Sequence, residues 1–265
     1  MSDKLQQLCD NLGGMDRVLV AFSGGVDSSF LLRVAAEVLG DRAVALTTRS
    51  PTEVSEDFET ADRLARQLGV THVVVDADEL EIPGYAANPT NRCFFCKDNL
   101  YRICHAEAAR RGIEHVVDGV NADDLGDYRP GLGAAEQHSV RHPLVEVGLS
   151  KAEIRQLSHA LGLPTWDKPS SPCLSSRFPY GTTITRPALD KVAKAEQVLH
   201  RLGFRECRVR FHEKIARIEV PASEIVRLVS EDTRRQIVDQ LRELGFPYVT
   251  LDLLGFRSGS LNEIL

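Results

Sequence analysis

The strongest chemical signal in the sequence is a run of seven residues, Ser-Gly-Gly-Val-Asp-Ser-Ser, from Ser23 to Ser29. Gly24 and Gly25 have no Cβ atom, so the backbone can turn tightly there and aim its N–H groups at an anion. The helix that we expect to follow adds unpaired N–H groups and the positive end of its dipole, and Ser28 and Ser29 add hydroxyl donors. A glycine turn with a plain helix cap is the alternative. The pattern predicts a phosphate-binding loop, distinct from the Walker A loop with its Gly-Lys-Ser/Thr ending.

The pair Cys93 and Cys96, in Asn-Arg-Cys-Phe-Phe-Cys-Lys, leaves three interpretations open. A thioredoxin-like redox pair would need a helix N-terminus in a thioredoxin βαβ context, which the surrounding pattern does not supply. A structural zinc site would need a fourth ligand, and neither His105 nor His115 stands at ordinary knuckle spacing. Two thiols packed in an apolar core are the third interpretation.

Cys173 differs from the remaining cysteines because it stands in a Pro/Ser-rich loop, next to Arg177. A nearby cation can lower the pKa of a thiol and favour the thiolate. Burial is the common fate of a single cysteine, but a loop of this polarity is an unusual place for it. The other three, Cys9, Cys104 and Cys207, lie in helix or strand patterns that favour burial.

The elements that position these groups alternate between strand and helix. Short apolar runs predict buried strands at 17–22, 43–48, 72–77 and 115–120. Helical spacing of apolar residues predicts helices at 30–40, 53–69, 99–112 and 150–164. This alternation indicates an α/β fold with a doubly wound parallel sheet that is covered on both faces.

A second, smaller α+β domain is expected after a change of pattern near residues 180 to 186. Helical patterns at 188–204 and 230–246 alternate there with short strand patterns at 207–211, 216–220 and 248–254. We therefore assign 1–183 to the first domain and 184–265 to the second. Arg208 and Arg210 stand two apart on a predicted strand, so both side chains leave the same face. Arginine forks bind phosphate bidentately, and a solvated strand face is the alternative.

Length, composition and charge limit the class of protein. The chain has 265 residues, 43% of them hydrophobic, which is enough for a sizeable core. A formal net charge of -6 does not favour a protein whose main task is to hold nucleic-acid phosphates. No run approaches the roughly 18 apolar residues of a membrane helix, and no signal-peptide pattern is visible. We expect a cytoplasmic protein, in which structural disulfides are disfavoured.

The loop at 23–29 resembles the Ser-Gly-Gly-x-Asp-Ser signature of the PP-loop ATP pyrophosphatases, which have the adenine nucleotide alpha hydrolase-like fold. The resemblance implies that the loop grips the β,γ-pyrophosphate of ATP while a substrate oxygen attacks the α-phosphate. It further implies that Asp27 helps to place Mg²⁺ and that the strand end at Thr47 to Arg49 lines the adenine pocket. Residues 118–124 look like a second superfamily segment. The resemblance makes the acids of this segment, Asp118, Asp123 and Asp124, candidates for the Mg²⁺ or phosphate site. The alternative is that they are solvated caps of a loop.

Three stretches together resemble the LarE family of sulfur transferases: 23–29, Pro-Cys-Leu-Ser-Ser-Arg-Phe-Pro-Tyr-Gly-Thr at 172–182, and Leu-Asp-Leu-Leu-Gly-Phe-Arg-Ser-Gly-Ser-Leu-Asn-Glu at 251–263. The resemblance implies maturation of the nickel-pincer nucleotide cofactor of lactate racemase. In that reaction a carboxylate of pyridinium-3,5-biscarboxylic acid mononucleotide is adenylated, and sulfur then displaces AMP to give a thiocarboxylate. A second round treats the other carboxylate.

The source of the sulfur depends on the cysteines. Cys173 matches the sulfur-donating cysteine of the family, which in some members becomes dehydroalanine. This sequence departs from the single-cysteine pattern, because it also has Cys93 and Cys96. Family members with such a trio are thought to hold a [4Fe–4S] cluster whose fourth iron carries the transferable sulfide. The resemblance thus implies metal ligation by Cys93, Cys96 and Cys173, or a sacrificial Cys173 without a cluster.

The same resemblance implies a substrate site formed by residues of the second domain and of the 172–182 stretch before it. Arg208 and Arg210 are expected to bind the substrate phosphate. Further candidates for the substrate site are Glu196, Ser176 and Arg177. The expected catalytic residues are Cys173, Asp27 and Arg177. Small-molecule binding in a symmetric homo-oligomer is implied, without a nucleic-acid or membrane partner. We expect Trp166, the only tryptophan, to fill the core.

Two rival functions belong to other classes. A tRNA 2-thiolation enzyme also joins a PP-loop to three cysteines and a cluster, but it usually adds zinc knuckles or a basic RNA-binding domain. A nucleotide-binding regulatory module would use the same loop without transfer, and would bind ATP without releasing pyrophosphate. That module gives no reason for Cys173 and Arg177 in one loop.

Overall fold

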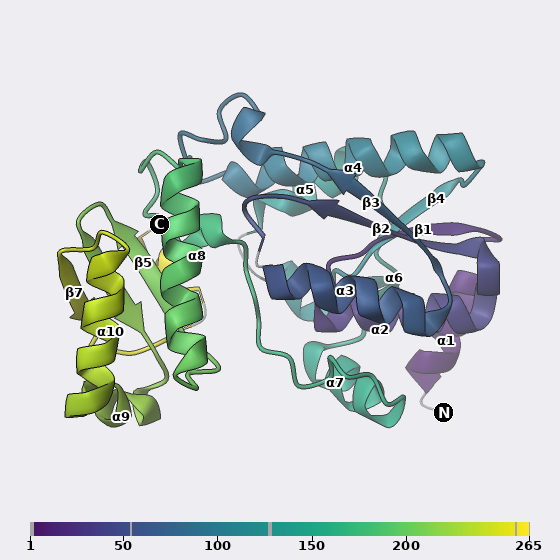
Figure 1. Ribbon diagram of the computed structural model, residues 1–265. Coiled ribbons are helices and arrows are strands. Elements are labelled where there is room, and N and C mark those ends of the chain that lie inside the picture. Colours follow the sequence, from purple (N-terminus) through teal and green to yellow (C-terminus); the bar gives the residue numbers. More distant parts are fainter. Residues whose placement is uncertain (1–2, 54, 127–128, 258, 265) are drawn as a thin grey trace. The chain divides into compact units, whose positions relative to one another are not determined.

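The computed structural model describes residues 3–53, 55–126, 129–257 and 259–264 (Figure 1). The chain divides into two compact units. The first unit comprises 1–82 and 91–171, and the second comprises 83–90 and 172–265. The sequence placed a boundary after residue 183, so the segments 83–90 and 172–183 fall on the other side of it. The limits of an independently folding domain stay a prediction.

The first unit is built around a four-stranded sheet in the order β3-β2-β1-β4, and all of its pairings are parallel. This confirms the predicted α/β class. The central strand β1 is a continuous apolar run, and β2 is apolar from Ala43 to Leu46, as expected for strands whose two faces are both covered. The strands are β1 (Val18–Ala21), β2 (Ala43–Arg49), β3 (Thr71–Asp76) and β4 (His115–Asp118).

Helices cover both faces of this sheet and give it two cores. Val18 and Val20 of β1 belong to one core, and Leu19 and Ala21 between them belong to the other. Figure 1 shows α4 and α5 on one face and α1, α2 and α3 on the opposite face. The helices of the first unit are α1 (Asp3–Gly13), α2 (Val26–Leu39), α3 (Ser55–Leu68), α4 (Arg92–Arg111), α5 (Pro130–Gln137), α6 (Pro143–Glu146) and α7 (Lys151–Ala160).

Two predictions for this unit were inaccurate. The strand at 71–76 is not buried, because it lies at one edge of the sheet, and Val74 is 39% exposed. Helix α4 begins at Arg92, seven residues before the predicted start, and so includes both Cys93 and Cys96 in its first turns. The extension packs closely on α5, where a Cβ on Gly131 would lie 2.9 Å from the side chain of Lys97.

The second unit contains a three-stranded sheet in the order β5-β6-β7, with one antiparallel and one parallel pairing. The apolar faces of its longer helices share one core with this sheet. Its elements are α8 (Arg186–Arg201), β5 (Arg208–His212), β6 (Ile215–Glu219), α9 (Ile225–Val229), α10 (Glu231–Glu243) and β7 (Tyr248–Leu251). These bounds follow the predicted pattern of the small α+β unit.

The segment 83–90 is held in the second unit by hydrogen bonds to residues about ninety positions later in the chain. Tyr85, 1% exposed, pairs its hydroxyl with that of Ser175 at 2.8 Å. The backbone N–H of Ile184 donates to the carbonyl of Ala86 at 2.8 Å. Among the residues that the structure describes, no helix is long and apolar enough to cross a membrane.

Candidate functional site

The loop between β1 and α2 has the backbone geometry of an anion cradle. Gly24 has φ +68°, a conformation that disfavours side chains, and a Cβ there would lie 2.9 Å from the carbonyl oxygen of Asp57. Gly25 is the N-cap of the 14-residue helix α2, and as a glycine it has no side chain that could cap the first N–H groups. The first N–H groups of α2 and the positive end of its dipole therefore lie where the sequence predicted a phosphate.

The hydroxyl groups of this loop differ in their contacts. The side chains of Ser23 and Ser28 lie 3.1 Å apart, and the Ser28 hydroxyl also donates to the carbonyl of Gly25. The hydroxyl of Ser29 is buried and has no hydrogen-bond partner among the described residues. Ser23 is exposed, so its hydroxyl is accessible to a ligand, whereas Ser29 lies within the core.

Two lysines that the sequence reading missed contact this loop. The ammonium of Lys151, the first residue of α7, lies 2.5 Å from Asp27 Oδ2. The ammonium of Lys168 donates to the carbonyl of Gly24 at 2.9 Å and pairs with Asp57 at 2.7 Å. The predicted helix at 150–164 already placed Lys151 at a helix N-terminus, but nothing in the sequence indicated that Asp27 would be its partner.

Asp27 keeps one carboxylate oxygen free for a ligand. Burial raises the pKa of its carboxyl, and the contact with Lys151 offsets only part of that rise. Its Oδ1 is buried and makes no hydrogen bond to any described residue. A single carboxylate oxygen beside a phosphate cradle suits Mg²⁺, which commonly takes one or two carboxylates together with substrate phosphates. The residues present therefore fit a magnesium ion.

Asp118, at the end of β4, is at the centre of a buried network. Its carboxylate, 2% exposed, accepts hydrogen bonds from Tyr101 Oη and His142 Nδ1, both at 2.6 Å. Burial would raise its pKa, but the bond to His142, the charge of Lys97 and the bond to Tyr101 lower the pKa overall. The next residue, Gly119, leaves no room for a Cβ, which would lie 2.7 Å from the backbone nitrogen of Ser28. This close approach brings the end of β4 against the first turn of α2.

The two other acids of this segment act as caps. Asp123 accepts a hydrogen bond from the backbone N–H of Lys151 at 2.9 Å, which holds the start of α7. Asp124 accepts one from the backbone N–H of Asn121 and pairs with Arg129. The contacts match the loop-cap interpretation, and a role in binding Mg²⁺ stays a prediction.

Thr47 and Arg49, which were predicted to line the adenine pocket, differ in burial. Thr47 is buried, donates to the carbonyl of Phe22 at 2.7 Å and lies 2.8 Å from His72 Nε2. Arg49 is exposed and pairs with Asp76 at 2.6 Å. Of the two, Thr47 has the fixed position, and an adenine contact by either residue stays a prediction.

The cysteine pair lies at the N-terminus of α4. Cys93 is exposed and Cys96 is half-buried, and residues three apart are neighbours on a helix surface. The thiol of Cys96 lies 4.0 Å from Glu79 Oε1. The pair is thus not part of an apolar core. It does lie at a helix N-terminus, one of the two conditions that the redox interpretation requires, because α4 begins at Arg92 and not at the predicted residue 99.

Cys173, in the second unit, is half-buried and is followed by a short turn that a buried ion pair holds in place. The guanidinium of Arg177 pairs with both carboxylate oxygens of Glu196, at 2.9 and 2.7 Å, and donates to the carbonyl of Cys173 at 3.0 Å. Arg177 is 1% exposed and Glu196 is 4% exposed. Arg177 therefore fixes the backbone that carries Cys173.

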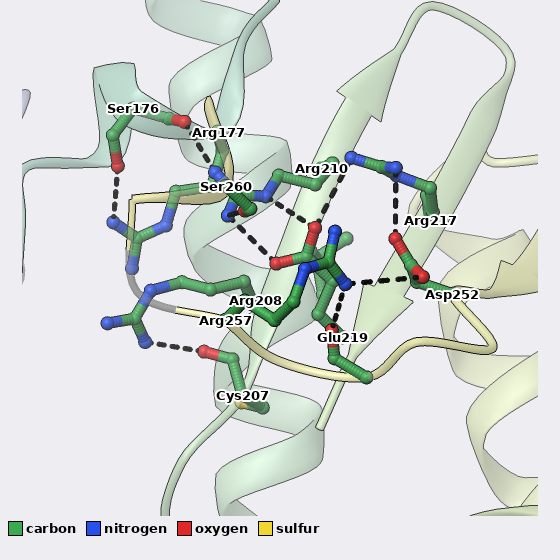
Figure 2. A network of polar contacts seen from close by, with 12 residues as sticks. Ser176, Arg177, Cys207, Arg208, Arg210, Arg217, Glu219, Asp252, Arg257 and Ser260 are labelled. Atoms are coloured by element: carbon green, nitrogen blue, oxygen red, sulfur yellow. Dashed lines mark hydrogen bonds and ion pairs between the residues drawn. The ribbon is translucent and has the colours of Figure 1, made fainter. Parts of the chain in front are cut away.

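Arg208 and Arg210 are both buried, so the solvated-face alternative is wrong. Arg210 forms a bidentate pair with Glu219, at 2.9 and 2.8 Å, and also donates to the carbonyl of Ser176 at 2.8 Å (Figure 2). Arg208 donates to the carbonyl of Cys207 at 2.6 Å, and its guanidinium lies 5.0 Å from the ring centroid of Phe256.

A cavity of about 240 Å³ opens beside this network, and Arg177 and Arg210 are among the residues that line it. The other predicted substrate residues, Ser176, Glu196 and Arg208, do not line it. The cavity also has lining residues that the sequence reading did not select, among them His212, Arg217 and Arg257.

The remaining expectations concern single residues. Cys104 and Cys207 are fully buried, as predicted, and burial raises the pKa of each thiol to about 12. Cys9 is half-buried. The prediction for Trp166 was wrong: it is 41% exposed, with its ring 4.6 Å from that of His159. Within the described ranges, no three His, Cys, Asp or Glu side chains form a preassembled metal-binding group.

Comparison with known proteins finds a family model that matches about half of the chain and relatives that match over its whole length. The family model described as Asparagine synthase matches residues 12–145. The pyridinium-3,5-bisthiocarboxylic acid mononucleotide synthase of Lactiplantibacillus plantarum is 40% identical over 266 residues, which is 100% of this chain and 96% of that protein. An uncharacterized protein of Synechocystis sp. is 47% identical over 265 residues, 100% of this chain and 99% of that protein. A tRNA-specific 2-thiouridylase of Xanthobacter autotrophicus is 31% identical over 58% of this chain and 49% of that protein.

Proposed function

Since this chain belongs to the LarE family of PP-loop enzymes and is an ATP-dependent sulfur transferase, we propose that its substrate is pyridinium-3,5-biscarboxylic acid mononucleotide. The structural observation that carries the ATP-dependent step is the glycine loop before α2, with one unpartnered oxygen of Asp27 beside it. The 40% identity, over the whole chain, to a pyridinium-3,5-bisthiocarboxylic acid mononucleotide synthase supports the choice of substrate.

In the proposed reaction, a carboxylate oxygen of the substrate attacks the α-phosphorus of ATP, and the bond to pyrophosphate breaks. The product is an acyl-adenylate, in which AMP is a far better leaving group than the original oxygen. The backbone N–H groups after Gly24 and the dipole of α2 stabilise the charge on the departing pyrophosphate. Asp27 Oδ1 would hold Mg²⁺, which supplies further neutralisation of the phosphate charge when bound.

Sulfur then replaces AMP at the activated carbonyl carbon. We propose that Cys93, Cys96 and Cys173 are the three thiolates that hold a [4Fe–4S] cluster, a group that would supply a transferable sulfide. All three are more accessible than the buried Cys104 and Cys207, which supports their selection. Without a cluster, the sulfur atom of Cys173 attacks the carbonyl carbon and AMP departs. Loss of the Cα proton then expels the thiocarboxylate and leaves dehydroalanine.

The decisive experiment measures AMP, pyrophosphate and thiocarboxylate after anaerobic incubation with ATP, the biscarboxylate mononucleotide and sulfide. Wild type is expected to form AMP only when the mononucleotide is present, whereas Cys173→Ala forms AMP without thiocarboxylate. Cys9→Ala serves as the control cysteine variant. AMP formation driven by transfer RNA instead of the mononucleotide would overturn the proposed substrate.

Iron and labile sulfide content separates the two sulfur sources. If the cluster is present, Cys93→Ala and Cys96→Ala each lower the iron content, and wild type turns over more than once per chain. If wild type binds no iron, each chain transfers one sulfur atom, and its mass falls by the mass of the H₂S lost from Cys173.

A further inference from the structure

The cavity in the second unit has a lining with an excess of positive charge. Four guanidinium groups line it, those of Arg177, Arg210, Arg217 and Arg257, against one carboxylate, that of Glu263. His212 is the remaining titratable group on the wall. A cavity with this balance attracts an anionic group, because opposite charge favours binding and the walls limit screening by water.

Two buried nitrogen atoms on this wall have no hydrogen-bond partner among the described residues: Arg217 Nε and His212 Nε2. The terminal nitrogens of Arg217 do have partners, Asp252 at 3.0 Å and Glu219 at 3.2 Å (Figure 2). A buried polar nitrogen without a partner is costly to the folded protein, because it has lost its hydrogen bonds to water and gained none in return. An oxyanion in the cavity would accept a hydrogen bond from Arg217 Nε–H, and one from His212 in the tautomer that carries its proton on Nε2.

The other arginines of the wall are engaged elsewhere. Arg210 uses its guanidinium on Glu219, on the carbonyl of Ser176 and on the hydroxyl of Ser260 at 2.8 Å. Arg177 pairs with Glu196, and Arg257 pairs with Glu263 at 2.9 and 3.0 Å. The free donor capacity of the wall is therefore concentrated on β5 and β6, at His212 and Arg217.

The geometry points to an oxyanion site formed by Arg217 and His212, which holds a phosphate or carboxylate group of the substrate. This assignment differs from the sequence-based one, in which Arg208 and Arg210 take the substrate phosphate. Arg210 instead shapes the wall by its bidentate pair with Glu219. The inference depends on the proposed function only for the identity of the ligand.

The test is equilibrium binding by calorimetry to the full chain without ATP. The variants are Arg217→Lys, which keeps the positive charge and loses the Nε–H group, and His212→Ala. Arg235→Lys is the matched control, because Arg235 is an exposed arginine on α10 that pairs with Glu231. Four probes are used: the biscarboxylate mononucleotide, its nucleoside without phosphate, nicotinamide mononucleotide without carboxylates, and inorganic phosphate.

Arg217→Lys and His212→Ala are each expected to weaken binding of the biscarboxylate mononucleotide about tenfold, and Arg235→Lys leaves it unchanged. If the site holds the phosphate, the loss recurs with nicotinamide mononucleotide and is absent with the nucleoside. If it holds a carboxylate, the loss recurs with the nucleoside and is absent with nicotinamide mononucleotide.

The inference is overturned if wild type binds an anionic probe and both variants bind it equally well, or if wild type binds none of the four. The proposed function fails separately. Wild type that binds nicotinamide mononucleotide or phosphate through Arg217, but not the biscarboxylate mononucleotide, would retain the oxyanion site and lose the proposed substrate.

Discussion

The ammonium group of Lys168 lies 2.9 Å from the carbonyl oxygen of Gly24. The same ammonium pairs with Asp57 on α3, so one side chain joins the glycine loop to the helix beside it. A cation at a loop carbonyl restrains the peptide from turning its oxygen toward a bound phosphate. The loop therefore keeps its N–H groups available, and its shape depends on residues far along the chain as well as on its own glycines.

The first prediction concerns Gly24. Gly24→Ala places a Cβ 2.9 Å from the carbonyl of Asp57 and 3.0 Å from Ala61, at a positive φ that costs an alanine roughly 1–2 kcal/mol by itself. We expect a lower melting temperature and loss of ATP binding. Gly25→Ala is the matched variant, because its Cβ meets only the Ser23 hydroxyl, at 3.4 Å. Equal melting temperatures for the two variants would contradict the argument.

A second prediction follows from the contact between Lys151 and Asp27. Lys151→Met leaves the partly buried carboxylate of Asp27 without its cation, which we expect to destabilise the protein by about 1 kcal/mol. Mg²⁺ should restore part of that loss, so the rise in melting temperature on adding Mg²⁺ should be larger in Lys151→Met than in wild type. Lys4→Met, which removes an exposed lysine that pairs with Glu153, is the control. An identical magnesium response in all three proteins would argue against a cation site at Asp27.

The buried pair of Arg177 and Glu196 gives a third prediction. Glu196→Gln leaves the guanidinium of Arg177 buried without a counter-charge, which costs about 3 kcal/mol. Urea unfolding should show this loss, whereas Glu231→Gln, at an exposed pair on α10, should leave the unfolding free energy unchanged. A loss of sulfur transfer by Glu196→Gln without any loss of stability would indicate direct contact with substrate instead.

A fourth prediction concerns pH and His142. Burial would lower the pKa of this histidine, but the hydrogen bond and charge of Asp118 outweigh it, and the pKa is raised above 6.5. The protonated histidine therefore stabilises the fold below pH 6.5, and this contribution is lost as the pH rises from 6.5 through the raised folded pKa. Asp118, with a lowered pKa, loses its contribution only at acid pH.

Unfolding free energies measured from pH 5.5 to 9 should show this loss in wild type and not in His142→Asn. His138→Asn, near Asp98 on α4, provides the comparison. A difference between wild type and His142→Asn that does not change with pH would exclude the proposed linkage.

Cysteine alkylation supplies a fifth prediction. At pH 8, iodoacetamide should label Cys93, Cys96 and Cys173 in the folded iron-free protein. Cys104 and Cys207, with fully buried thiols whose pKa is raised to about 12, should react only after unfolding in urea. Mass spectrometry of the digested protein reports each site, and rapid labelling of Cys207 before unfolding would contradict its burial.

Local pattern predicted the first unit well, for a physical reason. Strands that are buried on both faces tend to be apolar runs, and β1 and the first four residues of β2 have that composition. The glycine loop was readable because its conformation depends on missing Cβ atoms, a property of the residues themselves. Whether a strand lies at the edge of a sheet depends on which other strands pair with it. The exposure of Val74 on the edge strand β3 could therefore not be predicted from the local sequence.

The residues that the sequence did not predict owe their roles to distant partners. Lys151 and Lys168 are ordinary charged residues in sequence, and their significance lies in the contacts with Asp27 and Gly24. The early start of α4 depends on packing against α5. Arg208 and Arg210 were predicted to share a strand face, but their burial depends on Glu219 and Phe256, which come from other parts of the chain.

Residues 83–90 belong to the second unit although they lie between two segments of the first, and this has a consequence for synthesis of the chain. Tyr85 and Ala86 find their partners only when residues near 175–184 have been made, about ninety residues later. At ordinary translation speeds this is a wait of roughly 5–20 seconds. During that time an aromatic residue that is 1% exposed in the finished protein has no cover from the second unit. The order in which the ribosome releases the chain thus leaves this short segment as a target for chaperones before the second unit forms.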